Sequence, residues 1–261
     1  MAAEMSLKIM EKNRSYMAIF SSDWNECLAP TGPFDVISFN YPDLAPDLKT
    51  IFQQYTGNII PLGEATKKIR KLLPGPITEE QMDAYLDRSF VTYRGVPELI
   101  EWCKGEDILF MINTTGMSGF FQRVFSKGLL PPVPIVSAHP MIRYIQRKND
   151  PFHLIDLLEI HDKWKNTEKV VQSFSIPPDK IILVGDSGGD GPHFQWGAER
   201  GDFLIGSMTK PSLEKFCRKK GIAIDLQFGL SYSENEKRAP AKEMESDFME
   251  LSSIIEEIVK G

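Results

Sequence analysis

Five short apolar runs recur along the chain and alternate with longer segments of helical periodicity. Runs of this length, apolar at consecutive positions, are typical of strands buried on both faces, which occur in parallel sheets covered by helices. The fold class that this pattern predicts is α/β, with a doubly wound parallel sheet. The runs are Tyr16–Ser22, Ile108–Asn113, Val133–Ser137, Ile181–Gly185 and Phe203–Gly206.

The segment between the first two runs is too long for a simple connection. It holds about 85 residues, whereas one crossover between parallel strands requires a dozen or more. Apolar residues at helical spacing from Leu48 to Tyr55 predict one helix there, residues 62–73 a second, and a capping box at Thr78 opens a third. We therefore predict a small helical cap inserted into a Rossmann-like core. The cap takes residues 31–93, and the core takes residues 1–30 and 94–261.

Two later segments carry weaker patterns. The stretch Met141–Ile160 predicts a β-hairpin around the turn residues 148–151, although its second arm is equally compatible with a helix. Residues 231–242 are polar and include a proline, which indicates a linker or long loop. A final amphipathic helix follows, with apolar positions at Met244, Phe248, Leu251, Ile255 and Ile258.

Charge and cysteine content exclude several classes of protein. The net charge is −6, and the one basic block, Arg218–Lys220, is typical of a solvated helix end and not of a nucleic-acid site. The three cysteines, Cys27, Cys103 and Cys217, are widely spaced and indicate neither a disulfide framework nor a zinc ribbon. No apolar run approaches the roughly 18 residues that span a bilayer. We expect a soluble, cytoplasmic protein that binds neither nucleic acid nor membrane, with its oligomeric state open.

Polar side chains follow the apolar runs at the points where the predicted strands end. Because ligands bind beyond the carboxyl ends of strands in open α/β sheets, these residues are the candidates for a functional site. A lysine at the start of a later helix, Lys163 or Lys165, joins them. The strand-end candidates are Asp23, Asn25, Thr114, Thr115, Asp186 and Asp190.

The residue types at this sheet edge indicate a particular chemistry. Three carboxylates that converge repel one another, and a hard divalent cation such as Mg²⁺ is the simplest compensation. A lysine, a threonine hydroxyl and backbone amides would hold the oxygens of a phosphate group. Together these are the parts of a phosphoryl-transfer site in which an aspartate is the covalent nucleophile.

The order of these motifs resembles that of the haloacid dehalogenase superfamily, and within it the phosphoserine-phosphatase-like branch. The sequence "DWNECL" is similar to the family's first motif, with Asp23 as the nucleophile, and "TTGM" is similar to the second. Lys163 fits the spacing of the third motif better than Lys165, and "GDSGGD" matches the fourth. The resemblance covers residues 16–216 and includes "MTKP" after the fifth run.

The resemblance implies a magnesium-dependent hydrolase of a small phosphorylated metabolite that works through an aspartyl phosphate. It implies that Thr114 and Lys163 act in catalysis with Asp23 and Asn25. It places phosphate binding on Thr114 or its neighbour Thr115, on Gly116 and on Lys163. It places the metal at Asp23, Asn25 (through the backbone carbonyl), Asp186 and Asp190.

Asn25 departs from the family pattern, which has an aspartate two residues after the nucleophile. That aspartate exchanges a proton with the leaving oxygen and then with water, and an asparagine cannot exchange a proton. Glu26 and His193 are the candidate replacement bases. Three alternatives to a phosphatase stay open: a carbon–phosphorus or carbon–halogen hydrolase, a phosphotransferase, and a non-catalytic module that binds a phospho-ligand or a protein.

Overall fold

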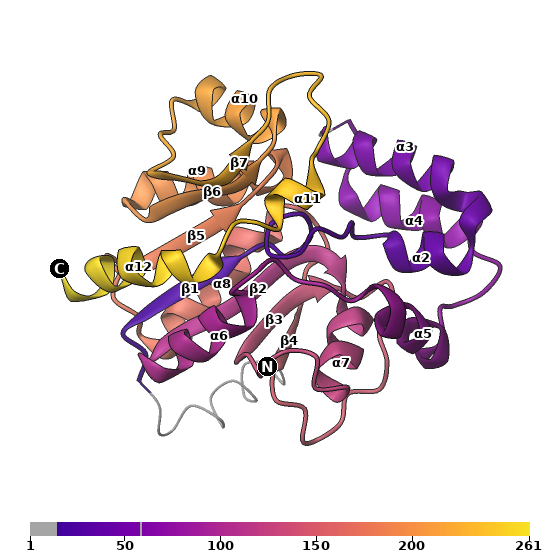
Figure 1. Cartoon of the computed structure of the whole chain (residues 1–261), viewed down its shortest axis with the longest axis horizontal. Coiled ribbons are helices and arrows are strands. Elements are labelled where there is room, and N and C mark those ends of the chain that lie inside the picture. The colour runs from indigo at the N-terminus through magenta and orange to yellow at the C-terminus, as the bar shows by residue number, and fades with distance from the viewer. Residues whose placement is uncertain (1–14, 58) are drawn as a thin grey trace.

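The computed structural model describes residues 15–57 and 59–261 and contains a seven-stranded sheet (Figure 1). Its strand order is β4-β3-β2-β1-β5-β6-β7, and every neighbouring pair is parallel. The predicted α/β fold class and parallel sheet are confirmed. The strands are β1 Ala18–Ser22, β2 Ile108–Met117, β3 Ile135–His139, β4 His153–Asp156, β5 Ile181–Gly185, β6 Phe203–Thr209 and β7 Leu226–Ser231.

Helices cover both faces of the sheet. Successive side chains of each strand point to opposite sides, so each face of the sheet carries its own apolar side chains. Phe20 of β1 packs into one apolar cluster and its neighbour Ile19 into another. The Phe20 side is covered by α6 Val96–Gly105, α7 Ser118–Ser126 and α12 Leu251–Lys260. The Ile19 side is covered by α8 Asp162–Phe174, α9 Gly191–Arg200 and α10 Pro211–Lys220.

A group of helices between β1 and β2 lies beyond the carboxyl ends of the central strands (Figure 1). The three helices expected there are present, and the capping box forms as predicted: Thr78 Oγ1 accepts from the Gln81 backbone N–H at 3.2 Å. One short helix, α2, was not predicted. The division of the chain into cap and core stays a prediction. The helices are α2 Asp35–Asn40, η1 Pro42–Leu44, α3 Ala45–Thr56, α4 Leu62–Leu72 and α5 Glu79–Ser89.

The predicted β-hairpin after the third strand is wrong. Residues 141–152 contain no strand, and β4 pairs parallel with β3 at the edge of the sheet. The second predicted arm contains the strand β4, whereas the first arm is not a strand: the backbone of Tyr144 exchanges two hydrogen bonds with the Gln122 side chain of α7, at 2.8 and 3.0 Å. This segment therefore packs on a helix instead of pairing as a strand.

The C-terminal region differs in detail from its prediction. The strand β7 was not predicted, and the polar stretch after it is a loop, as expected, that ends in the short helix α11 Pro240–Glu243. The final helix begins only at Leu251, because Asp247 caps a separate 3-10 turn, η3 Phe248–Glu250, by accepting from the Met249 N–H at 3.0 Å. Among the described residues, no helix has both the length and the apolar character to cross a membrane.

Candidate active site

Asp23 is the residue that follows β1, and its carboxylate is almost completely enclosed. Its Oδ1 accepts from the backbone N–H of Trp24 at 2.6 Å, and its Oδ2 accepts from Lys163 Nζ at 2.8 Å. Its own N–H donates to the carbonyl of Val184 in β5, which fixes the strand end. Burial raises the pKa of the Asp23 carboxyl, and the charge of Lys163 opposes that rise.

Lys163 lies in the first turn of α8 and connects two carboxylates. Its ammonium group donates to Asp23 and also to Asp190 Oδ1 at 2.5 Å, and its side chain is 1% exposed. Burial alone would lower the pKa of Lys163, but the two carboxylates outweigh it and hold that pKa above its ordinary value. Lys165 is 42% exposed and pairs with Asp162 at the surface, so the geometry distinguishes the two lysines.

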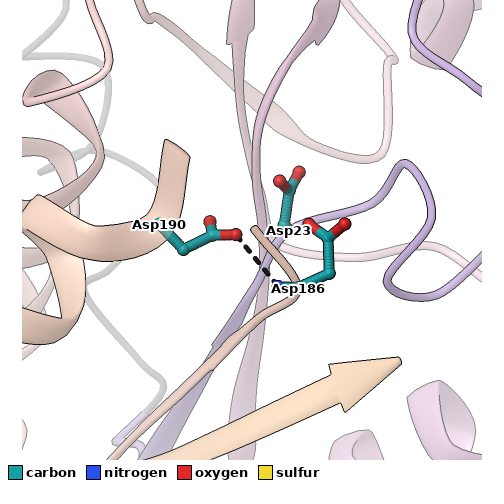
Figure 2. Close-up of side chains that lie close together, drawn as sticks. All are labelled: Asp23, Asp186 and Asp190. Atoms are coloured by element: carbon teal, nitrogen blue, oxygen red, sulfur yellow. Dashed lines mark hydrogen bonds between the residues drawn. The ribbon is translucent and has the colours of Figure 1, made fainter. Parts of the chain in front are cut away.

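Asp186 and Asp190 lie at the carboxyl end of β5, and Figure 2 shows their carboxylates with that of Asp23. The side chain of Asp190 is directed at the backbone: its Oδ2 accepts from the N–H groups of Asp186 and Ser187 at 3.0 and 3.1 Å. Gly185 permits this approach, because a Cβ there would lie 2.5 Å from the Cβ of Asp190. Asp190 therefore holds the turn and the lysine.

The three aspartates offer the donor set that a divalent cation needs. One oxygen from each lies within 4.8 Å of the others, and no other group of three or more acidic, histidine or cysteine side chains in the described part of the chain meets that condition. Asp186 Oδ2 is buried and has no hydrogen bond, although Lys210 Nζ lies 2.5 Å away. Burial raises the pKa of Asp186 to about 8, so its charged form needs a cation beside it.

These residues fit Mg²⁺, which takes one or two carboxylates and keeps several waters. Asp186 Oδ2 has no hydrogen bond, so Asp186 is the carboxylate best placed for direct coordination. Both oxygens of Asp23 and both oxygens of Asp190 already accept hydrogen bonds, so each of these two residues would coordinate directly only by giving up one of those bonds and otherwise through water.

Thr114 and Thr115 lie near the end of β2 and face different neighbours. Thr114 Oγ1 accepts from the Gly116 N–H at 3.1 Å and contacts Asn25 Oδ1 at 3.5 Å, whereas Thr115 Oγ1 lies 3.3 Å from the hydroxyl of Tyr55. Gly116 is needed for close approach, since a Cβ there would lie 2.7 Å from Asn25 Oδ1. The predicted phosphate-binding residues are thus brought to the same sheet edge.

Asn25 makes structural contacts at both ends of its amide. Its Nδ2 donates to the carbonyl of Thr31 at 3.2 Å, while its Oδ1 faces Thr114 and Gly116. The next residue, Glu26, has a φ of 59° and pairs with Lys210 and Arg238. Asn25 therefore ties the loop after β1 to the end of β2.

Neither proposed replacement base reaches the nucleophile. Glu26 is held by two cations, and the cavity that contains Asp23 is not lined by it. His193 is buried against Thr167, with its Nε2 at 3.0 Å from the hydroxyl, and burial lowers its pKa to about 3.

Three residues at the site were not assigned a role from the sequence. Lys210 follows β6 directly, so the strand-end rule would have found it had it been applied to the fifth apolar run. Tyr55 was predicted only as an apolar position of a helix. Arg238 comes from the polar loop after β7, where the sequence carries no local signal of a site.

The cavity at the nucleophile is small. Its volume is about 20 Å³, and Pro33, Phe52, Tyr55 and Thr56 of the helical insertion cover the core residues. A much larger cavity, about 380 Å³, opens near the amino ends of β1 and β2. That larger cavity is lined mainly by apolar and proline side chains and contains none of the candidate catalytic residues, so size alone does not locate the chemistry.

Several solved structures share this architecture. A phosphoserine phosphatase, solved as a phospho-aspartyl intermediate analogue, superposes with a TM-score of 0.64 at 16% identity, over 93% of this chain and 99% of that chain. The fold is that of the haloacid dehalogenase-like phosphatases. No protein-family model matches the sequence, and no curated protein matches it at a significant level.

Two further structures extend this likeness across the haloacid dehalogenase-like fold. A HAD family hydrolase from Salmonella enterica serovar Typhi has a TM-score of 0.60 at 16% identity, over 82% of this chain and 68% of that one. A cytosolic 5'-nucleotidase IIIB bound to cytidine has a TM-score of 0.56 at 13% identity, over 99% and 90%. At these identities the likeness establishes the fold, and the chemistry has to be argued from the site.

Proposed function

We propose that the protein is a magnesium-dependent phosphatase-type hydrolase of a small phosphorylated metabolite, with Asp23 as the covalent nucleophile. The observation that carries the proposal is the buried Asp23 carboxylate, which is hydrogen-bonded to Lys163 and faces Asp186 at the carboxyl end of the sheet. The solved phosphatases with the same fold support it.

In this proposal Asp23 attacks phosphorus, the bond to the leaving oxygen breaks, and water then cleaves the aspartyl phosphate. Lys163 and the hydroxyl of Thr114 or Thr115 bind the transferring group, and the Gly116 N–H, which donates to Thr114 Oγ1, orients that hydroxyl. A bound Mg²⁺ would neutralise charge on the phosphoryl oxygens. The helical insertion excludes water, and because the cavity holds about 20 Å³, it has to open to admit substrate.

The proposal is tested by phosphate release from p-nitrophenyl phosphate and a panel of small phosphomonoesters, with Mg²⁺ and with a chelator. We expect release that depends on Mg²⁺ and falls to background in Asp23→Asn, because the amide cannot form the aspartyl phosphate. Asp179→Asn is the matched control, since that side chain is 70% exposed. Full activity in Asp23→Asn would refute the proposed nucleophile.

A second candidate is a binding module that holds a phosphate group without turnover. Asn25 favours it, because its amide is engaged in structural contacts and cannot exchange a proton. Binding of beryllofluoride with Mg²⁺, no phosphate release by the unmodified protein, and release by Asn25→Asp would together select this candidate. Turnover by the unmodified protein would eliminate it.

A further inference from the structure

A phosphatase with asparagine at position 25 needs another source for the proton that the leaving oxygen requires. The described side chains that line the cavity with Asp23 include four hydroxyls and two ammonium groups. The hydroxyls belong to Tyr55, Thr56, Thr115 and Ser187, and the ammonium groups to Lys163 and Lys210.

The two ammonium groups are unsuited to donate that proton, because each is the counter-ion of two carboxylates. Lys163 holds Asp23 and Asp190, and Lys210 holds Asp186 and Glu26. A neutral Lys163 would leave two buried carboxylates uncompensated, and a neutral Lys210 would leave the buried Asp186 without its counter-ion. Both lysines therefore have to stay charged, and neither can give its proton to the leaving oxygen.

Among the hydroxyls, the phenol of Tyr55 is the most acidic, with an ordinary pKa of about 10. The hydroxyls of serine and threonine do not titrate in the working range of proteins. Thr56 donates its proton to the carbonyl of Phe52 at 2.8 Å. Tyr55 and Thr115 are partnered by each other, at 3.3 Å, and among the described residues the phenol has no carboxylate or backbone acceptor that would fix its proton.

The position of Tyr55 suits a group that meets the leaving oxygen. In an in-line displacement the leaving oxygen departs on the side of phosphorus opposite the nucleophile. Asp23 approaches from the sheet, so that side faces the helical insertion, and Tyr55 comes from α3 of this insertion. Its side chain is 1% exposed, and the rings of Phe34 and Phe52 pack against it at 6.1 and 5.4 Å, which fixes its direction.

We propose that Tyr55 donates its phenolic proton to the leaving oxygen and recovers a proton from the water that cleaves the aspartyl phosphate. This inference rests on the proposed phosphatase function. In the first step the phosphorus–oxygen bond to the leaving group breaks as the phenol O–H transfers its proton, which gives a neutral alcohol and a phenolate. In the second step water loses a proton to the phenolate as it attacks phosphorus, which restores the phenol and releases phosphate and the Asp23 carboxylate.

The environment of Tyr55 is consistent with this exchange. Burial raises the pKa of its phenol above the ordinary value, and the nearby Asp23 charge acts in the same direction. A raised pKa keeps the phenol protonated before reaction and makes the phenolate a strong base toward water, and it also makes the phenol a weaker acid toward the leaving oxygen, so the first step requires a basic leaving group. A side chain of this kind supplies both halves of the exchange that Asn25 cannot perform.

The test compares Tyr55→Phe on two substrates that differ in how much their leaving groups need a proton. An alkyl phosphate releases a basic alkoxide, whereas p-nitrophenyl phosphate releases a stable phenolate that needs no proton. We expect Tyr55→Phe to lose roughly 100- to 10,000-fold in kcat/KM on the alkyl phosphate. On p-nitrophenyl phosphate it should keep the first-turnover burst and then turn over slowly, because the second step lacks its base.

Tyr41→Phe is the matched control, since Tyr41 is a tyrosine of the same insertion whose hydroxyl accepts from Gln81 and which does not line the cavity with Asp23, and it should leave both substrates unaffected. Urea unfolding of each variant checks that the fold is retained. An unchanged kcat/KM of Tyr55→Phe on the alkyl phosphate, or an equal loss in the burst on both substrates, would overturn the role of Tyr55 alone. An unmodified protein that releases no phosphate from either substrate would overturn the phosphatase function as well.

Discussion

Two lysine-centred ion clusters lie side by side at the carboxyl edge of the sheet, and they differ in how the chain builds them. The inner cluster is Asp23, Lys163 and Asp190. Each of these residues either follows a strand of the central sheet or lies at the start of a helix. The outer cluster is Asp186, Lys210, Glu26, Arg238 and Glu243. Two of its residues, Arg238 and Glu243, come from the segment that follows β7.

The comparison separates two kinds of buried charge. In the inner cluster one ammonium compensates the nucleophile, so its loss should affect chemistry and stability together. In the outer cluster Arg238 compensates Glu243, whose carboxylate also accepts from the hydroxyls of Tyr93 and Tyr232 at 2.5 and 2.7 Å. Arg238 and Glu243 do not line the cavity that contains Asp23. Loss of their ion pair should therefore affect stability far more than chemistry.

The largest effect is expected for Lys163→Met, which removes the only cation of the inner cluster among the described residues. Two buried carboxylates would then lack a counter-ion, and we expect a loss of about 3–5 kcal/mol in the free energy of unfolding. Phosphate release should fall to background. Urea unfolding and the phosphate assay measure the two effects.

Lys165→Met is the control for this change, because Lys165 is two residues away and 42% exposed. Its unfolding free energy should change by no more than about 0.5 kcal/mol. If the two variants behaved alike, the inner cluster would have no special part in either stability or chemistry.

The second effect is expected for Arg238→Ala in the outer cluster. Glu243 is fully buried and would lose its counter-ion, so we expect a loss of about 3 kcal/mol in the free energy of unfolding. Arg94→Ala is the control, because the Arg94 pair with Asp247 is exposed at the surface and should contribute at most about 1 kcal/mol. Phosphate release should decrease less in Arg238→Ala than in Lys163→Met, and the reverse order would contradict the distinction between the clusters.

The same distinction explains what the sequence predicted and what it did not. Asp23, Asp186 and Asp190 follow strands that form continuous apolar runs, and parallel strands bring their carboxyl ends to one edge, so their meeting could be predicted from local pattern. Lys163 follows no such run, and the spacing of the motifs predicted it. Arg238 lies 212 residues from Glu26 in the chain. No local period or spacing encodes such a pair, because it depends on where the loop after β7 returns.

The errors in the fold have similar physical causes. The hairpin was predicted from the turn residues 148–151, but the Gln122 side chain satisfies the Tyr144 backbone in the first arm, and this segment needs no strand partner. The edge strand β7 was missed because three of its six residues are exposed, which removes the continuous apolar run. The hydrophobic pattern therefore predicted the central strands. It failed where a side chain satisfied the backbone in place of a strand partner, and where an edge strand is partly exposed.

The smallest of the expected effects concerns pH and a group packed beneath the inner cluster. Burial lowers the pKa of His193 to about 3, and the charge of Lys163 acts in the same direction. The folded protein therefore binds fewer protons at this histidine than the unfolded chain, whose pKa is about 6.5, so stability is lost as pH falls below that value. At pH 5 the loss from His193 is about 2 kcal/mol.

The measurement is urea unfolding of the unmodified protein and of His193→Gln at pH 7 and pH 5. Glutamine can still bond Thr167, the hydroxyl partner of His193, but has no proton to gain, so the variant should lose about 2 kcal/mol less between the two pH values. In Lys163→Met the pKa of His193 should rise, because a nearby positive charge is gone, and its share of the pH dependence should shrink. An identical pH dependence in all three proteins would show that His193 is not coupled to the inner cluster and that the cluster's charges are screened from the layer beneath it.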